Sequence, residues 1–179
     1  MKHYILAAVV LHIFSLLLLL KMRGFNTDET FSQKAAKSNL SAVLYSLSFI
    51  VPFVFLYLFF TNWFIPQFNL SGLFYLFLVI ALGFQILCTF FPERGGWLTF
   101  LHQTLTGISA ISLLPLLILI VLSNTVNVPG RILSTIAILW MVYLLYIGLR
   151  NLQGHAKALW LQIGYYVLFF ASIVAVTYL

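Results

Sequence analysis

Six long apolar runs, separated by short polar connections, account for nearly the whole chain. Each run is close to the roughly 20 residues that a helix needs to cross the hydrocarbon core of a bilayer. The runs are continuously apolar, whereas a membrane β-barrel strand alternates between a lipid-facing and a lumen-facing residue. We therefore predict an all-α, polytopic membrane protein, a six-helix bundle in which residues 1–179 form one domain. The predicted spans are about residues 4–20, 40–60, 70–91, 98–122, 132–149 and 158–178.

The composition excludes a soluble domain. Apolar residues make up 63% of the chain and charged residues only 7%. A soluble protein of this length would have to expose much of that apolar surface to water. The single cysteine, Cys88, lies within the third run, so an intrachain disulfide is impossible.

The basic residues predict how the chain crosses the membrane. Cytoplasmic connections carry an excess of Lys and Arg. The connections after the first, third and fifth runs hold seven of the nine: Lys21, Arg23, Lys34, Lys37, Arg94, Arg150 and Lys157. The opposite side holds Lys2 and Arg131. We therefore expect both termini outside the cytoplasm, and the formal charge of +6 then requires no nucleic-acid partner.

The connections differ in kind. Residues 21–39 form the longest connection, and Asn26 with Glu29 three positions later resembles a capping box. We expect a helix that begins near Thr27 and runs through Ser41 into the second span. On the other side, Asn62–Asn69 and Ser123–Gly130 are short and uncharged, each with a proline, as tight turns would be.

Polar residues inside the runs are the strongest functional signal, because each costs energy in hydrocarbon and tends to face protein or water. Two runs place such residues at helical spacing on one face: Thr99, His102, Thr106, Ser109 and Ser112 in the fourth, and Ser38, Ser41, Tyr45 and Ser48 in the second. With the predicted topology, most of them fall in the cytoplasmic half. This predicts a polar pocket open to the cytoplasm beneath an apolar plug. The alternative is that the hydroxyls bond their own helix or serve helix packing.

The most distinctive local sequence is Phe91-Pro92-Glu93-Arg94-Gly95-Gly96-Trp97. Proline ends the third helix, the glycines permit a sharp return, and tryptophan suits the membrane interface. His102 follows early in the next run, where Glu93 can hydrogen-bond its imidazole and tune its charge. The candidate ligand-binding residues are Glu93, Arg94, His102, Gln103, Gln85, Tyr45 and Gln162.

A Phe-Pro-acid end to the third span, formed by Phe91, Pro92 and Glu93, followed by His102 early in the fourth, resembles a family of prokaryotic six-span membrane proteins known only as a domain of unknown function. The similar layout covers most of the chain, although the family's acid is usually Asp. The resemblance implies a six-helix fold in the cytoplasmic membrane of a prokaryote and a site around this turn. It implies no established activity.

Several chemistries are disfavoured by the residues available. The histidines His3, His12, His102 and His155 lie at different predicted depths and no span carries a His-x-x-x-His pair, so we expect neither a metal nor another cofactor, and we name no catalytic residue. The leading hypothesis is non-enzymatic: the chain binds or moves a small amphiphile or lipid headgroup, with membrane lipids as its partners. An intramembrane lipid-modifying enzyme and an accessory subunit of a membrane complex remain alternatives.

Overall fold

The computed structural model describes residues 1–26, 29–150 and 158–179; for residues 148–150 and 158 it describes the backbone alone. In chain order its elements are α1 (Tyr4–Arg23), α2 (Phe31–Ala36), α3 (Asn39–Phe59), the π-helical η1 (Phe60–Phe64), α4 (Ile65–Gln67), α5 (Gly72–Thr89), α6 (Gly96–Leu122), α7 (Val128–Arg150) and α8 (Ala158–Tyr178). Lys157 and the side chain of Arg150, which contribute to the predicted orientation, lie outside the described residues.

The predicted all-α membrane fold is confirmed. Within the described ranges, six helices are long and apolar enough to cross a bilayer. They are α1, the continuous helix formed by α3, η1 and α4, and then α5, α6, α7 and α8. A helix satisfies its backbone hydrogen bonds internally, which is what a chain in hydrocarbon requires.

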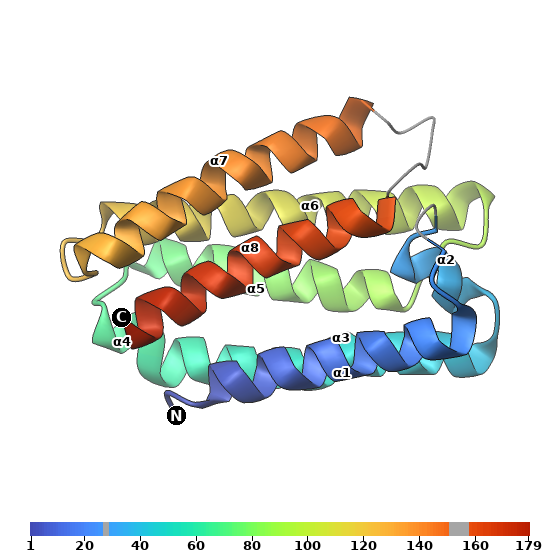
Figure 1. Ribbon diagram of the computed structural model, residues 1–179, viewed down its shortest axis with the longest axis horizontal. Coiled ribbons are helices and arrows are strands. Elements are labelled where there is room, and N and C mark those ends of the chain that lie inside the picture. The colour runs from blue at the N-terminus through green and yellow to red at the C-terminus, as the bar shows by residue number, and fades with distance from the viewer. Residues whose placement is uncertain (27–28, 151–157) are drawn as a thin grey trace.

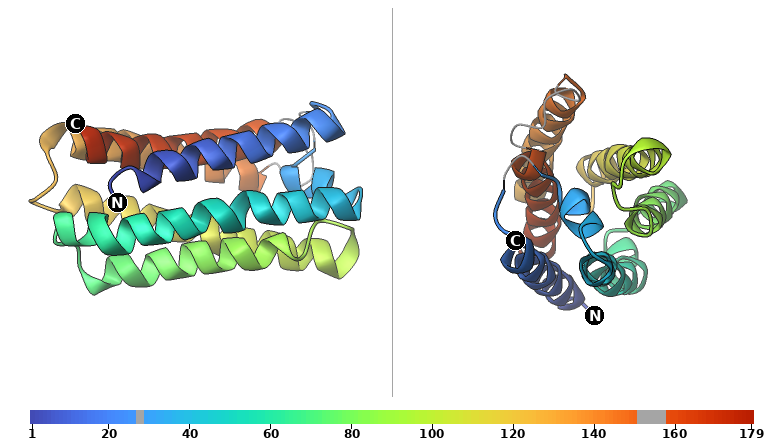
Figure 2. Two further views of the ribbon diagram at one scale, coloured as in Figure 1. Left: turned by 90° about the horizontal axis from the view of Figure 1, so that it is seen from below. Right: turned by 90° about the vertical axis from the view of Figure 1, so that its right-hand side faces the viewer.

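The six long helices form a ring. Neighbours along the ring are α1, α3, α5, α6, α7 and α8, and α8 returns to lie beside α1, where the contact is least extensive. Both termini lie at one end of the bundle, which we call the terminal end, and α2 lies at the other, the α2 end (Figure 1). Viewed from the α2 end, α2 sits inside the ring of long helices (Figure 2).

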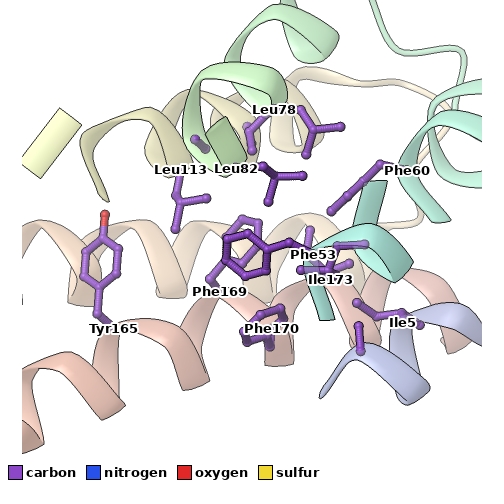
Figure 3. Packing of buried hydrophobic residues seen from close by; sticks show 14 of the residues in the cluster. Ile5, Phe53, Phe60, Leu78, Leu82, Leu113, Tyr165, Phe169, Phe170 and Ile173 are labelled. Atoms are coloured by element: carbon purple, nitrogen blue, oxygen red, sulfur yellow. The ribbon is translucent and has the colours of Figure 1, made fainter. Parts of the chain in front are cut away.

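Large aromatic side chains fill the interior of the ring. Phe59, Phe60, Phe64 and Phe74 are fully buried between η1 and its neighbours. Further along, Phe169 of α8 lies against the apolar side chains of α5 and α6 (Figure 3). Because lipid is as apolar as these side chains, close packing rather than escape from water holds such an interior together.

The second long helix continues beyond its predicted end. The structure has no turn over Asn62–Asn69 as a whole: helical backbone runs through η1 to Gln67, and the reversal is confined to the residues before Gly72. Pro66 does not break the helix before its end: α4 continues through Pro66 to Gln67, and the chain reverses directly after it. Asn69, with φ of 46°, takes the left-handed conformation that the reversal needs.

The connection between the first two long helices also differs from its prediction. The helix expected to run through Ser41 is divided: α2 ends at Ala36, and Ser38, in extended conformation, caps α3 through its hydroxyl. The capping box is formed by Thr30 and Gln33, not by Asn26 and Glu29. Thr27, the expected start, lies outside the described residues.

Candidate functional site

The turn between α5 and α6 positions the site. Gly95 and Gly96 have φ of 98° and 54°, conformations that residues with a Cβ rarely adopt, and they allow α6 to start directly after the turn. The Gly95 N–H donates to the hydroxyl of Thr99, which satisfies one free donor at the start of α6. The turn thereby places Glu93 and Arg94 between two long helices.

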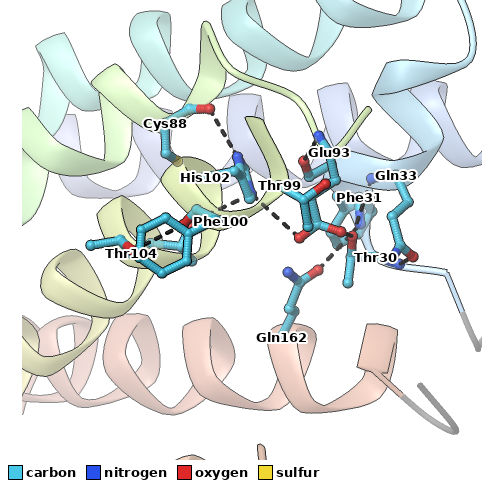
Figure 4. A network of polar contacts seen from close by, with 12 residues as sticks. Thr30, Phe31, Gln33, Cys88, Glu93, Thr99, Phe100, His102, Thr104 and Gln162 are labelled. Carbon is cyan, nitrogen blue, oxygen red and sulfur yellow. Dashed lines mark hydrogen bonds and ion pairs between the residues drawn. The ribbon is translucent and has the colours of Figure 1, made fainter. Parts of the chain in front are cut away.

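Glu93 points into the ring. Its side chain is only 7% exposed, and its Oε1 lies 3.9 Å from Nε2 of His102, an ion-pair distance too long for a hydrogen bond. The other carboxylate oxygen lies 3.4 Å from the hydroxyl of Thr30, which donates to it (Figure 4). The backbone N–H of Glu93 donates to the hydroxyl of Ser32 at 2.9 Å. One residue of the turn therefore contacts both α6 and the start of α2.

The hydrogen bonds of His102 define the role of each ring nitrogen. Nδ1 lies 3.0 Å from the carbonyl oxygen of Cys88, so Nδ1 carries a hydrogen and donates. Nε2 faces the hydroxyl of Thr106 at 3.3 Å and the carboxylate of Glu93. In the neutral ring Nε2 accepts from Thr106, and in the charged ring it donates toward Glu93. The arrangement accommodates both protonation states of the imidazole.

Gln162 of α8 completes the attachment of α2. Its side-chain oxygen accepts from the backbone N–H of Phe31 at 3.2 Å, a donor in the first turn of α2 that has no partner within the helix. Phe31 and Ser32 are themselves buried. The α2 helix is thus held inside the ring from the α5–α6 turn and from α8.

Of the residues that the sequence singles out, the structure brings Glu93, His102 and Gln162 into one network. Tyr45 is buried and contacts the side chain of Cys88, beside His102. Gln85 is buried one helical turn before Cys88, and its backbone carbonyl oxygen accepts a hydrogen bond from the Cys88 thiol.

Two predicted site residues lie elsewhere. Gln103 is exposed on the outer side of α6. Adjacent residues of a helix lie about 100° apart around its axis, so Gln103 does not share the buried face of its neighbour His102. Arg94 is exposed and lines a different part of the molecule, a cavity to which Glu93 does not contribute.

The sequence interpretation missed Thr30 and Ser32 as members of the network. The available signal was the spacing of Thr30 and Gln33, a capping box with Gln in place of Glu. That signal identifies the start of a helix but does not indicate that the helix folds back into the ring.

The hydroxyl stripes are largely accounted for by structural bonds. Ser109 donates to the carbonyl of Ala81 on α5, and Ser112 donates to its own helix. Ser38 and Ser41 both accept from the guanidinium of Arg23, which ties α1 to the start of α3.

A cavity of about 420 Å³ lies on the outer side of the same turn, between α3 and the ends of α5 and α6. Its walls are mainly apolar, with Leu47, Phe90 and Leu98 among them. Ser46 also lines it, but its hydroxyl already donates to the carbonyl of Thr89. Arg94 is the charged side chain that lines this cavity.

The rest of the α2 end carries further charges. Glu29 pairs with Lys37 at 2.7 Å and with Lys34 at 3.5 Å. The hydrogen bond from the Lys37 ammonium, together with the charges of both lysines, holds the pKa of Glu29 below its ordinary value. Lys34 is fully buried and donates to the carbonyl of Gly24 at 2.9 Å, so it fastens the connection to α2.

Across residues 1–26, 29–150 and 158–179, no three His, Cys, Asp or Glu side chains gather closely enough to hold a metal ion. Comparison of the chain with protein-family models, curated proteins and solved structures found no match.

Proposed function

We propose that this protein binds an anionic membrane amphiphile at the α2 end, with the headgroup on Arg94 and the chain in the apolar cavity beside it. The observation that carries the proposal is the different surroundings of two neighbouring charged side chains. Glu93 is directed into the buried network, and Arg94 lines the cavity. A guanidinium beside an apolar wall matches a phosphate or carboxylate that is joined to an alkyl chain.

In this proposal the α2 end faces the cytoplasm, as the distribution of Lys and Arg predicts. The other basic side chains at this end add a positive potential that attracts anionic headgroups. Lys21 and Arg94 are exposed, whereas Arg23 is engaged with the α3 serines. Arg94 therefore combines an exposed charge with an adjoining apolar cavity.

The Glu93–His102 pair is the proton-responsive part of the proposal. It lies on the inner side of the turn that presents Arg94, and it contacts α2 through Thr30. A proton taken up by the pair makes this turn more positive, which favours an anionic headgroup on Arg94.

The test compares two short-chain lipids that differ in headgroup charge. The full chain is placed in phosphatidylcholine nanodiscs and titrated with dioctanoyl phosphatidylglycerol or dioctanoyl phosphatidylcholine, and bound lipid is counted by native mass spectrometry. We expect the anionic lipid to bind about tenfold more tightly, as one charge-assisted hydrogen-bonded contact allows. Arg94→Gln should remove the preference, whereas Arg131→Gln, the same change at the terminal end, should leave it intact.

Two further arms identify the part of the ligand that is recognised. Ala42→Trp, which fills the cavity and leaves Arg94 in place, should weaken binding of both lipids. Inorganic phosphate should compete poorly if the alkyl chain contributes. Equal binding of the two lipids by the unmodified chain, or an equal loss in the Arg94 and Arg131 variants, would overturn the proposal.

A further inference from the structure

A second polar group is buried far from the α5–α6 turn. His12 of α1 is 2% exposed and lies among four aromatic rings. The ring centroids of Phe49, Tyr166, Phe170 and Phe53 lie 4.8, 5.7, 5.9 and 6.3 Å from that of the imidazole. These rings supply no counter-charge, and an unpaired charge in such surroundings is costly, so the imidazole is neutral.

The backbone of α3 determines which nitrogen of His12 carries the hydrogen. Pro52 lies inside α3 and has no N–H, so the carbonyl of Ser48, four residues earlier, lacks its usual helical donor. His12 Nδ1 lies 2.7 Å from that carbonyl oxygen and donates to it. A neutral imidazole with hydrogen on Nδ1 has a free lone pair on Nε2.

That lone pair has no partner in the structure. Nε2 of His12 is one of two buried side-chain nitrogen or oxygen atoms, among the described residues, without a hydrogen bond. An unsatisfied buried acceptor is uncommon and calls for a reason. In this case an apolar groove adjoins the imidazole of His12.

His12 lines a groove of about 370 Å³ between α1 and α8, the least extensive contact in the ring. The groove is otherwise almost entirely apolar, with walls that include Leu16, Leu17, Val167 and Ala171. Leu17 and Val167 are also exposed on the outer surface of the bundle, so the groove opens sideways to the bilayer.

We infer that this groove binds a lipophilic compound with a hydroxyl group, an alcohol or a phenol dissolved in the bilayer, whose hydroxyl donates to Nε2 of His12. The apolar walls fit the hydrocarbon part, and the aromatic rings around the imidazole favour a flat, ring-bearing head. A plain alkyl chain also fits the groove but leaves Nε2 unsatisfied. The site is separate from the Arg94 cavity and does not depend on the function proposed there.

The experiment isolates the hydroxyl. Radiolabelled 4-nonylphenol binds to the full chain in nanodiscs, and 4-nonylanisole, its methyl ether, serves as the matched competitor without a donor. One net hydrogen bond predicts that the phenol binds about three- to tenfold more tightly than the ether. Dodecanol and dodecyl methyl ether form the corresponding pair for an aliphatic alcohol. Comparison of the two pairs shows whether the groove prefers a phenol or an aliphatic alcohol.

Two variants locate the effect. His12→Asn retains an N–H near the position of Nδ1 for the Ser48 carbonyl but removes Nε2, so the preference for phenol over ether should vanish while the fold is kept. Ala171→Trp leaves His12 unchanged and fills the groove, so both compounds should bind more weakly. Circular dichroism and thermal unfolding establish that each variant is folded.

Equal affinity of the phenol and the ether for the unmodified chain would overturn the inference. So would a preference that persists in His12→Asn, or binding that is unaffected by Ala171→Trp. Neither result bears on the preference for anionic lipids at Arg94, so the two proposals fail independently.

Discussion

The hydroxyl of Thr30 lies 3.4 Å from the carboxylate of Glu93, although the two residues are 63 positions apart in the chain. Thr30 is also the N-cap of α2, and its oxygen accepts from the backbone of Gln33. One side chain therefore both starts α2 and attaches it to the α5–α6 turn. The protein contains a natural reporter for this attachment, because its single cysteine, Cys88, is fully buried beside the network.

Thr30→Val keeps the shape of the side chain and removes both hydrogen bonds. Loss of an N-cap alone costs about 1 kcal/mol, so α2 should leave its position about five- to tenfold more often. We expect thiol reagents to label Cys88 faster by about that factor. Thr104→Val is the control, since Thr104 is exposed and its hydroxyl donates to the carbonyl of Phe100 in its own helix. Equal labelling rates in the two variants would show that Thr30 does not secure α2.

The Glu93–His102 pair predicts the pH dependence of lipid binding. Protonation of His102, whose Nε2 lies 3.9 Å from Glu93, makes the turn more positive, so phosphatidylglycerol should bind severalfold more tightly as the pH is lowered. His102→Asn, which retains a donor for the Cys88 carbonyl, should flatten this dependence.

His3 provides the control for that experiment, because it is an exposed histidine at the terminal end that contacts Tyr178. His3→Asn should leave the pH profile of the unmodified chain unchanged. A profile that is altered by His3→Asn and not by His102→Asn would remove the pair from the proposal.

Glu29 predicts a loss of stability in acid. Because Lys37 lowers its pKa in the folded protein, the carboxylate stabilises the fold fully above its ordinary value of about 4.5, and this contribution disappears as pH falls through the lowered pKa. The melting temperature of Glu29→Gln should therefore lie below that of the unmodified chain at neutral pH and converge with it in acid. Lys37→Gln should behave alike, and the double variant should add little. A gap that is constant with pH would contradict this origin.

Gly95 predicts a backbone effect. With φ of 98° and ψ of 164°, it occupies a region that is nearly exclusive to glycine, so Gly95→Ala should destabilise the protein by about 1–3 kcal/mol even though no atom obstructs the new methyl group. Gly107→Ala is the matched change inside α6, also without obstruction, and should be neutral or stabilise by up to about 1 kcal/mol. Reversible unfolding in mixed micelles measures both.

The sequence predicts most of the fold and part of the site. Continuous apolar length identifies the six helices. Local spacing also suggests that Glu93 faces His102, because His102 lies in the second helical turn of α6, directly after the connection that contains Glu93. The place of α2 inside the ring depends on contacts such as Phe31 with Gln162, 131 positions apart, which no local pattern encodes. Pro66 illustrates the opposite limit: a residue typical of turns lies here inside the last helical residues before the turn, Ile65–Gln67.

The ring closes where its first and last helices meet. A chain that is synthesised from its N-terminus inserts α1, α3, α5, α6 and α7 before α8 exists. Until then the ring has an open side, and the space that Phe169 and Phe170 finally fill is available to lipid tails. The arrival of α8 must displace those lipids, so the closing of the ring is a step in which lipid of the bilayer competes with the helix.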